Sequence, residues 1–302
     1  MRIGITLNEG RGPQALDRLT DEIRQAADDG FASAWLPNIF GFDAMTALAV
    51  AGSRVPGIEL GTAVVPTYPR HPAALAQQAR TTALAIGDGR FTLGIGLSHQ
   101  VVIENMFGLD FDRPVRHMRE YLAILGPLLE RQPVSFTGET MRANIALSTP
   151  GEGPIPILLA ALGPQMLKLA GQHTAGTILW MTGAKTIASH IAPVINEAAR
   201  AAGAPAPRII CNLPVCITDD PEPARAQAAE NFAMYNTLPS YRAMMDREGA
   251  EGAADLAIIG TEEEVAARLA DVEAAGATEF GAIVYMRGDT RTRKFLSQLA
   301  QS

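Results

Sequence analysis

Small residues and a proline stand together at Ala161-Leu162-Gly163-Pro164, after a short apolar segment and before a predicted helix. Backbone N–H groups at such a helix start, together with the helix dipole, can hold a phosphate. A second glycine-rich turn is expected at Gly94-x-Gly96. The same composition also suits an ordinary structural turn, so both interpretations stay open for residues 161–164.

The histidines could do acid–base chemistry, but they form no nucleophile or metal pattern. Ser98 and His99 are adjacent, and neighbours on an extended chain point in opposite directions, so they do not pair as nucleophile and base. The five histidines lack carboxylate or cysteine neighbours at ligand spacing, which disfavours a metal site. Neither a G-x-S-x-G motif nor a Walker A loop occurs. The sequence therefore indicates neither metal catalysis nor a serine nucleophile.

Aromatic and apolar residues accompany these polar groups after the short apolar segments. A lining of this kind suits a planar ring with a phosphorylated tail. The residues are Phe40, Phe42, Tyr68, Phe107, Trp180 and Met181.

Eight short apolar segments alternate with helical patterns and must position these groups. The expected strands cover residues 2–7, 33–36, 58–65, 91–95, 155–160, 177–181, 208–217 and 279–285. Asp43 is expected to cap the second helix and Thr261 the last one. Strands that are nearly all apolar fit a parallel sheet buried on both faces. We therefore expect a (β/α)8 TIM barrel with its reactive groups at the carboxyl ends of the strands.

The chain is longer than a simple barrel requires. It has 302 residues, against ~250 for a typical barrel, and we assign the surplus to insertions near residues 132–153 and 235–258. Residues 132–153 predict a β-hairpin, and residues 221–248 predict a long helical stretch. We expect a single barrel domain over residues 1–302. The rival is a doubly wound open sheet, but no G-x-G-x-x-G follows the first strand.

Composition narrows the class of protein and its partners. With 47% hydrophobic and 19% charged residues, the chain is globular. Lys plus Arg total 25 and Asp plus Glu total 32, a net charge of −7, which disfavours nucleic acid. Two cysteines make no disulfide framework, and neither a signal peptide nor a membrane-spanning run is found. We expect a cytoplasmic protein with a small-molecule substrate.

Five stretches spread over nearly the whole chain carry a family resemblance. They are residues 29–37 (DGFASAWLP), 60–64 (LGTAV), 68–72 (YPRHP), 89–96 (GRFTLGIG) and 259–265 (IGTEEEV). Together they resemble the luciferase-like monooxygenase superfamily, and within it the branch of coenzyme F420-dependent oxidoreductases. The resemblance implies a (β/α)8 barrel with insertions that holds a flavin or deazaflavin ring at its mouth.

The resemblance also implies site residues. It places a non-prolyl cis peptide at Ala63-Val64, with Val64 against one ring face. Asn38, Thr67 and Ser98 would surround the ring or its ribityl chain, and Ala161, Leu162 and Gly163 would hold the phosphate. Arg70 and Lys185 could meet the acidic tail of F420. The stretch that borders the cofactor or the substrate consists of Trp180, Met181, Thr182 and Gly183.

Chemistry would follow from the cofactor. A deazaflavin passes hydride from its C5, so the protein must set donor and acceptor face to face in a dry pocket. Reduction of a C=C, C=N or C=O bond also needs a proton donor. His99 is the first candidate and His71 the second. The alternatives are that His71, just before Pro72, caps a helix and that His99 is an ordinary loop residue.

Two departures from related enzymes bear on the substrate. Methylenetetrahydromethanopterin reductases carry a glutamate on the first strand where this sequence has Thr6. The glucose-6-phosphate dehydrogenases of the branch have an acid and a histidine after the second strand, where Pro37 and Asn38 stand here. We therefore expect neither a methanopterin nor a sugar phosphate as substrate.

Two rival functions stay open. One is an FMN-dependent monooxygenase of the same fold, and the other is a non-catalytic protein that binds F420 or a flavin. By analogy with the family, a homodimer is expected.

Overall fold

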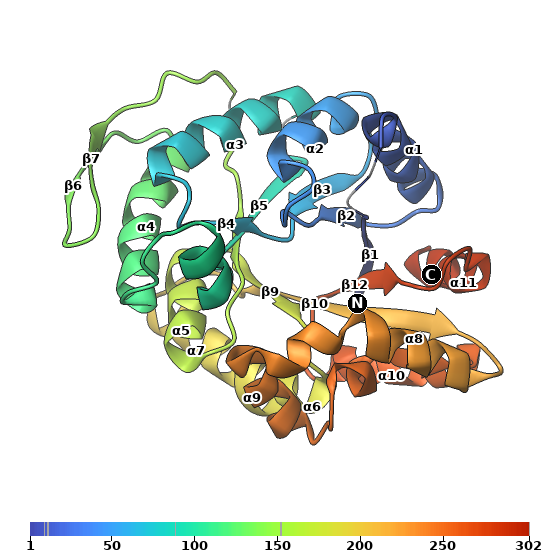
Figure 1. Ribbon diagram of the computed structural model, residues 1–302. Helices are drawn as coiled ribbons and strands as arrows, with labels where there is room; N and C mark the ends of the chain where they lie inside the picture. The colour runs from blue at the N-terminus through green and yellow to red at the C-terminus, as the bar shows by residue number, and fades with distance from the viewer. Residues whose placement is uncertain (9, 11, 88, 152, 302) are drawn as a thin grey trace.

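A closed barrel of eight parallel strands forms the centre of the protein (Figure 1). The computed structural model describes residues 1–8, 10, 12–87, 89–151 and 153–301. Each strand pairs with the next, and the last pairs with the first, so the predicted (β/α)8 TIM barrel is confirmed. In barrel order the strands are β1 (Arg2–Thr6), β2 (Ser33–Leu36), β3 (Glu59–Thr62), β5 (Phe91–Gly96), β8 (Ile157–Leu159), β9 (Gly176–Trp180), β10 (Arg208–Ile217) and β12 (Glu279–Val284).

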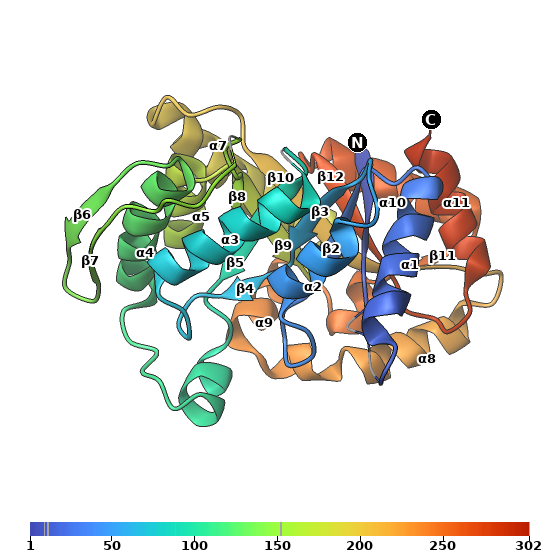
Figure 2. The same cartoon turned by 90° about the horizontal axis from the view of Figure 1, so that it is seen from above.

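Helices cover the outside of the barrel, as Figures 1 and 2 show. They are α1 (Ala15–Asp28), α2 (Ala44–Gly52), α3 (Pro72–Ile86), α4 (Pro114–Leu129), α5 (Pro164–His173), α6 (Ala184–Thr186), α7 (Ala192–Ala201), α8 (Pro221–Asn231), α9 (Pro239–Glu248), α10 (Glu262–Ala274) and α11 (Thr290–Ala300). As predicted, the side chain of Asp43 caps α2 and that of Thr261 caps α10. Within the described ranges, no helix combines the length and the apolar character needed to cross a membrane.

A two-stranded hairpin lies between α4 and β8. β6 (Val134–Thr137) pairs antiparallel with β7 (Arg142–Ile145), and Figures 1 and 2 show the hairpin projecting beyond α4. Glu120 on α4 holds its turn, because the carboxylate accepts hydrogen bonds from the backbone N–H groups of Glu139, Thr140 and Met141. The hairpin occupies the stretch for which the sequence predicts one.

Two local predictions are wrong. Residues 221–248 do not form one helical stretch: α8 ends at Asn231, a 3-10 turn η3 (Ala233–Thr237) follows, and α9 begins at Pro239. A proline lacks the backbone N–H and forces the residue before it out of helical geometry, and Leu238 is extended. The helix capped by Thr261 is not the last, because α11 follows β12. Short strands β4 (Val65–Pro66) and β11 (Ile258–Gly260) also extend the sheet.

Large side chains fill the barrel interior. Trp35, Leu158, Ile178 and Ile210 form one buried cluster, against which Val64 packs from the partly buried layer above. The indole of Trp35 fits because Gly61 has no side chain, and a Cβ there would lie 2.1 Å from the ring atom Cζ3. The cluster therefore forms the base on which the candidate site rests.

Candidate cofactor and active site

The predicted site residues follow five strands that are neighbours in the barrel. In barrel order these strands are β2, β3, β5, β8 and β9. Parallel strands end at the same edge of a sheet, so the residues lie along one arc of the carboxyl end of the barrel. Asn38 follows β2, residues 63 and 64 follow β3, residues 98 and 99 follow β5, residues 161–163 follow β8, and residues 180–183 end or follow β9.

The peptide bond between Ala63 and Val64 is cis, as predicted, and it separates β3 from β4. The glycines of β5 leave room for this segment. A Cβ on Gly96 would lie 2.8 Å from Cγ2 of Val64, and a Cβ on Gly94 would lie 1.9 Å from the backbone oxygen of Thr62. The sequence suggested a turn at Gly94-x-Gly96, and this prediction is wrong. The two glycines belong to strand β5, where the absence of side chains allows the neighbouring segment to approach closely.

Burial divides the predicted site residues into two groups. Thr67, Ala161, Met181 and Thr182 are almost fully buried, and Gly183 is buried too, so they can shape the site only from behind. The others are half-buried or exposed and can contact a ligand. Along the arc this accessible group consists of Asn38, Ala63, Val64, Ser98, His99, Leu162, Gly163 and Trp180, and His71 at the start of α3 is exposed as well.

Two residues of the arc have a left-handed backbone. The φ angle is 63° at Ser98 and 49° at Met181. Such angles are uncommon for residues with a side chain, and they cluster at functional sites. The geometry thus marks the ends of β5 and β9, where the sequence also places site residues.

The ring of His99 is half-buried beside the segment that connects β10 to β11. Its centroid lies 5.7 Å from that of Tyr241 on α9, in an edge-to-face arrangement. Burial lowers the pKa of His99 below its ordinary value, so the ring is neutral near pH 7. A neutral imidazole here can accept a proton, and the protonated ring at lower pH can donate one.

His71 caps helix α3. Its Nδ1 atom accepts a hydrogen bond from the backbone N–H of Ala73 at 3.2 Å, and its Nε2 atom lies 3.3 Å from the carbonyl oxygen of Arg142. Because a carbonyl can only accept, the ring proton resides on Nε2 and is donated to Arg142. With both nitrogens engaged, the geometry favours His99 over His71 as the acid–base group.

The two cations predicted to meet an acidic tail differ in their surroundings. Arg70 forms an ion pair with Asp43 and donates to Oε1 of Gln78 at 2.9 Å, which ties the start of α3 to α2. Lys185 is exposed at the start of α6. Lys185 is therefore the more accessible of the two.

Aromatic side chains from the β10–β11 connection form a wall beside Trp180. The ring of Trp180 lies 5.7 Å from Phe232 and 5.5 Å from Tyr235. Tyr235 in turn lies 5.1 Å from Tyr241, and Phe232 lies 5.7 Å from Tyr285 after β12. We call these five residues the aromatic wall. The recurrence of aromatic residues at 232, 235 and 241 was the sequence feature that could have indicated this wall.

His117 on α4 belongs to the site region but was missed in the sequence. Its Nε2 atom lies 3.0 Å from Oγ1 of the buried Thr67, and its ring stacks on Tyr68 at 3.9 Å. Burial lowers the pKa of His117 to about 4. These three residues line a cavity of about 250 Å³ together with residues 69–72 and Met141. His117 and Tyr121 are four residues apart and therefore lie on one face of a helix. This spacing was the sequence feature that could have drawn attention to His117.

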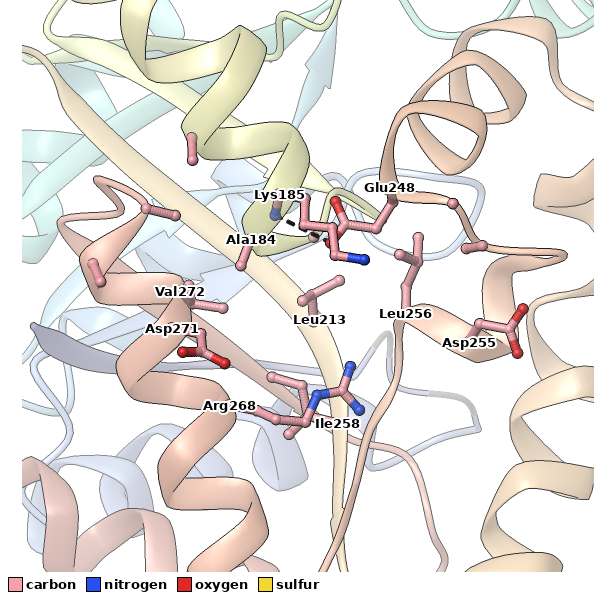
Figure 3. A pocket seen from close by; sticks show the side chains of 16 residues that line it. Ala184, Lys185, Leu213, Glu248, Asp255, Leu256, Ile258, Arg268, Asp271 and Val272 are labelled. Atoms are coloured by element: carbon pink, nitrogen blue, oxygen red, sulfur yellow. Dashed lines mark hydrogen bonds between the residues drawn. The ribbon is translucent and has the colours of Figure 1, made fainter.

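A larger cavity, of about 620 Å³, lies on the helix side of β10 (Figure 3). Leu213 lines it, and Leu213 points away from the barrel interior because the preceding Asn212 points into it toward Thr6. Of the residues predicted to contact the cofactor, Gly183 and Lys185 are among the described lining residues. A Cβ on Gly183 would lie 2.4 Å from the carboxyl carbon of Glu248. Gly183 thus packs against Glu248 rather than facing the arc.

The turn after β8 leads directly into α5. Gly163 is the N-cap residue and Pro164 occupies the first turn, and no side chain of the described residues caps this end. Gly163 is exposed, and a Cβ there would meet nothing within 4 Å. The space at the side-chain position of Gly163 is therefore open to an anionic group, and the N–H groups of a helix start are the donors that such a group binds.

Sequence comparison supplies relatives. The chain matches the family described as "Luciferase-like monooxygenase" over residues 1–279. It is 31% identical over 190 residues to a putative coenzyme F420-dependent oxidoreductase of Mycobacterium tuberculosis, covering 58% of this chain and 54% of the relative. It is 32% identical over 158 residues to a 5,10-methylenetetrahydromethanopterin reductase of Archaeoglobus fulgidus, covering 52% of this chain and 47% of that protein. The chain thus spans about half the length of these two curated relatives.

Structure comparison agrees on the fold. The coenzyme F420-dependent tetrahydromethanopterin reductase of Methanopyrus kandleri superposes with a TM-score of 0.83, covering 98% of this chain and 97% of the other. The two sequences are 20% identical. A likeness at this identity establishes a common barrel architecture.

Proposed function

We propose that this chain, which belongs to the luciferase-like monooxygenase family, is an oxidoreductase that uses coenzyme F420 and transfers hydride between the deazaflavin C5 and an organic substrate. The mycobacterial relative supports the choice of F420, since it carries that cofactor in its name. The chain spans about half the length of the two curated relatives, so the support for its activity comes from its own site.

One observation carries the proposal. The accessible residues expected from the family form a continuous arc over five consecutive strands, and the arc includes the uncapped start of α5 at Gly163. A ring needs an apolar surface, and its phosphorylated tail needs N–H donors. Val64 and Trp180 offer the first, and Gly163 offers the second.

The chemical types of the residues in the arc match the two parts of the cofactor, its ring and its anionic tail. The arc offers half-buried apolar and aromatic side chains, while the start of α5 offers backbone donors that no described side chain occupies. The missing side chain of Gly163 leaves space for a group to approach the backbone. Such a combination suits a flat heterocycle with an anionic tail better than a charged sugar or a nucleic acid.

Each residue then has a role. Val64 would support one ring face, with Asn38 and Ser98 beside the ring or its ribityl chain. Leu162 and Gly163 would hold the phosphate. The buried residues Thr67, Ala161, Met181 and Thr182 would support these contacts from behind, as their burial allows, whereas Gly183 packs against Glu248 and has no part in them.

When bound, F420 supplies a hydride donor or acceptor at C5 of its ring. The aromatic wall would shield the space beside Trp180 from water once substrate is bound, which would keep the local dielectric low. His99, half-buried and packed against Tyr241 of that wall, would hold or accept the proton that accompanies hydride transfer. Burial also raises the pKa of Tyr241 above its ordinary value, so this phenol keeps its proton and is not the base.

The substrate is proposed to be uncharged or weakly polar. Thr6 faces the barrel interior with its Oγ1 atom 3.4 Å from Oδ1 of Asn212. No carboxylate stands at this position, in contrast to the glutamate expected for methanopterin reductases. The aromatic wall next to Trp180 offers apolar contacts to a substrate instead.

Titration of the apoprotein with F420 and with FMN tests the cofactor. We expect quenching of F420 fluorescence with micromolar affinity, and FMN binding at least about tenfold weaker, a difference of ~1.4 kcal/mol. Tighter binding of FMN would favour the flavin monooxygenase alternative. A substitution of Gly163→Asp should weaken F420 binding because it brings a carboxylate to the phosphate, whereas Gly163→Ala should bind nearly as wild type.

A turnover assay separates an enzyme from a binding protein. The protein is mixed with oxidised F420 and a panel of alcohols, or with reduced F420 and a panel of ketones and activated alkenes. The F420 absorbance should change with at least one of these substrates. Binding of F420 without any absorbance change over the panel would favour the non-catalytic alternative.

We also propose a homodimer, by analogy with the family. Light scattering should then give a mass of twice the 32.0 kDa chain. A mass of one chain over the micromolar range would contradict this.

A further inference from the structure

His190 contacts the proposed phosphate turn from a different part of the chain. It lies on η2 (Ile187–Ile191), and its side chain is 8% exposed. Its Nε2 atom lies 2.8 Å from the carbonyl oxygen of Leu162. A carbonyl can only accept, so Nε2 carries a proton and donates it to Leu162. This contact links the turn after β8 to the helix that follows β9.

The contact fixes the orientation of one peptide group. In a trans peptide the carbonyl oxygen and the N–H of the next residue point in opposite directions. Since His190 holds the carbonyl of Leu162, the N–H of Gly163 points away from His190. Gly163 is exposed, and the space that a Cβ atom would occupy there is open, so a ligand can reach this part of the backbone.

The helix that carries His190 is itself fixed at its start. The carboxylate of Glu248, on α9, accepts hydrogen bonds from the backbone N–H of Thr186 at 2.8 Å and from its hydroxyl at 2.7 Å. It also accepts from the backbone N–H of Lys185 at 3.1 Å, and Figure 3 shows Glu248 facing this helix start. The position of His190 is therefore set by α6 and by α9 together.

The backbone around His190 is a π-turn. The N–H of Ala192 bonds the carbonyl of Ile187, which closes a wider ring than an α-helix does. Single π-turns inside helices occur frequently at functional sites. Here the π-turn contains the residue that reaches the turn after β8.

We propose that His190 is a positioning residue for the phosphate group of the cofactor. It holds the Leu162–Gly163 peptide so that the N–H, and not the carbonyl oxygen, faces the phosphate. Without His190 this peptide can rotate and present its carbonyl oxygen to the anion, which is repulsive. The inference rests on the proposed function, because it takes the cofactor to carry a phosphate at this turn.

The test compares ligands with and without the phosphate. Affinities of wild type, His190→Ala and His190→Gln are measured for F420 and for its phosphate-free deazaflavin riboside, and likewise for FMN and riboflavin. His190→Ala should weaken binding of the phosphorylated ligand by about 10- to 100-fold. This is the loss expected when the hydrogen bond from the N–H of Gly163 to the charged phosphate is no longer made. The phosphate-free ligand should change by less than about twofold, which lies within the effect of a neutral change. Gln keeps an N–H donor and should restore most of the loss.

Controls separate positioning from general stability. His173→Ala removes an exposed histidine from the last turn of α5 and should leave all affinities unchanged. If His190→Ala does not fold, the comparison is made with His190→Gln and His190→Asn. Both keep an N–H donor, but the asparagine side chain is shorter and does not reach the carbonyl of Leu162. His190→Asn should therefore bind the phosphorylated ligand more weakly than His190→Gln. Equal weakening of both ligands by His190→Ala, or no weakening, would overturn the proposal.

The outcome for wild type separates this inference from the proposed function. If wild type binds neither F420 nor FMN, the proposed function fails and the inference fails with it. If wild type binds F420 and the phosphate-dependent part of the affinity is unaffected in the His190 variants, the role of His190 alone is wrong.

Discussion

The Nη2 atom of Arg208 lies 2.9 Å from the Oε2 atom of Glu279, at the end of the barrel opposite the candidate site. The side chain of Glu279 is 1% exposed. Nη1 of Arg208 also donates to Oε1 of Glu59 at 2.7 Å, and Nε1 of Trp35 donates to Oε1 of Glu279 at 2.8 Å. These groups stand at or near the amino ends of β2, β3, β10 and β12. Arg208 joins β10 directly to β3 and β12, and Glu279 adds β2 through its hydrogen bond from Trp35.

Substitution of Arg208→Met should strongly destabilise the protein. It leaves Glu59 and Glu279 with the partly exposed Arg2 as their remaining cation. Breaking a buried pair costs about 3–5 kcal/mol when no other cation is present, so the loss should approach but not exceed this range. The free energy of unfolding from urea denaturation checks this. The control is Arg225→Met, since Arg225 forms an exposed pair with Glu222 and such pairs contribute ~0–1 kcal/mol. Equal effects of the two substitutions would contradict the prediction.

Acid should weaken the same cluster. Burial acts to raise the pKa of Glu59, but the hydrogen bonds and charge of Arg208 outweigh it and hold the pKa below the ordinary value. A carboxylate with a lowered pKa stabilises the fold above its unfolded pKa of ~4.3, and this contribution is lost as the pH falls through the lower folded value. The free energy of unfolding should therefore decline below about pH 4, and Glu59→Gln should make that decline shallower. A variant with the wild-type slope would show that Glu59 plays no part.

Much of the fold follows from the sequence because its determinants are local. Apolar segments of strand length and the caps Asp43 and Thr261 are read directly from residue types, and the structure confirms these caps and the barrel. The break at Pro239 was also visible in the sequence, but the helical spacing around it outweighed the proline in the prediction. The helix α11 was missed because its cap, Asp289, follows a strand with only a short polar connection.

The glycines of β5 yield a third prediction. A Cβ on Gly94 would lie 1.9 Å from the backbone oxygen of Thr62, which cannot move aside as a side chain end can. Gly94→Ala should therefore destabilise the protein by about 1–3 kcal/mol, the range for overpacking, and should weaken cofactor binding because β3 must shift. Urea denaturation and F420 titration measure the two effects.

Gly126 is the matched control for Gly94. It lies in α4, and a Cβ there would meet nothing within 4 Å. Gly126→Ala should be neutral or should stabilise by about 0.5–1 kcal/mol, because alanine favours the helix. Equal losses from the two substitutions would show that the close approach at β5 is not the cause.

The candidate site was less predictable than the fold, because its contacts join residues far apart in the sequence. Strand ends and the family resemblance located the arc, yet they did not reveal that Thr67 is buried against His117, fifty residues later. Nor did they reveal that Gly183 packs against Glu248. Such pairings depend on how the helices after β5 and β10 pack, and residue types alone do not fix that.

The fourth prediction concerns His99 and pH. Substitution of His99→Gln should lower kcat by about 10²–10⁴-fold, the usual contribution of a general acid or base, with little change in F420 affinity. Because burial lowers the pKa of His99, the ring is neutral at pH 7 and serves as a base when substrate is oxidised. Because this pKa lies below the ordinary value of a histidine, the ring gains its proton only at a lower pH than a free imidazole does. As the pH falls through that range, reduction of substrate should speed up and oxidation should slow down. The variant should lose both trends.

His71→Asn provides the comparison for His99. Asparagine can still cap α3, so this variant should keep the fold and nearly the wild-type kcat. Its pH profile should retain the trends that His99→Gln loses, because His71 has both ring nitrogens engaged with Ala73 and Arg142. If His71→Asn abolishes turnover while His99→Gln does not, the two histidines have exchanged roles, and the proton passes at the start of α3 instead of beside the aromatic wall.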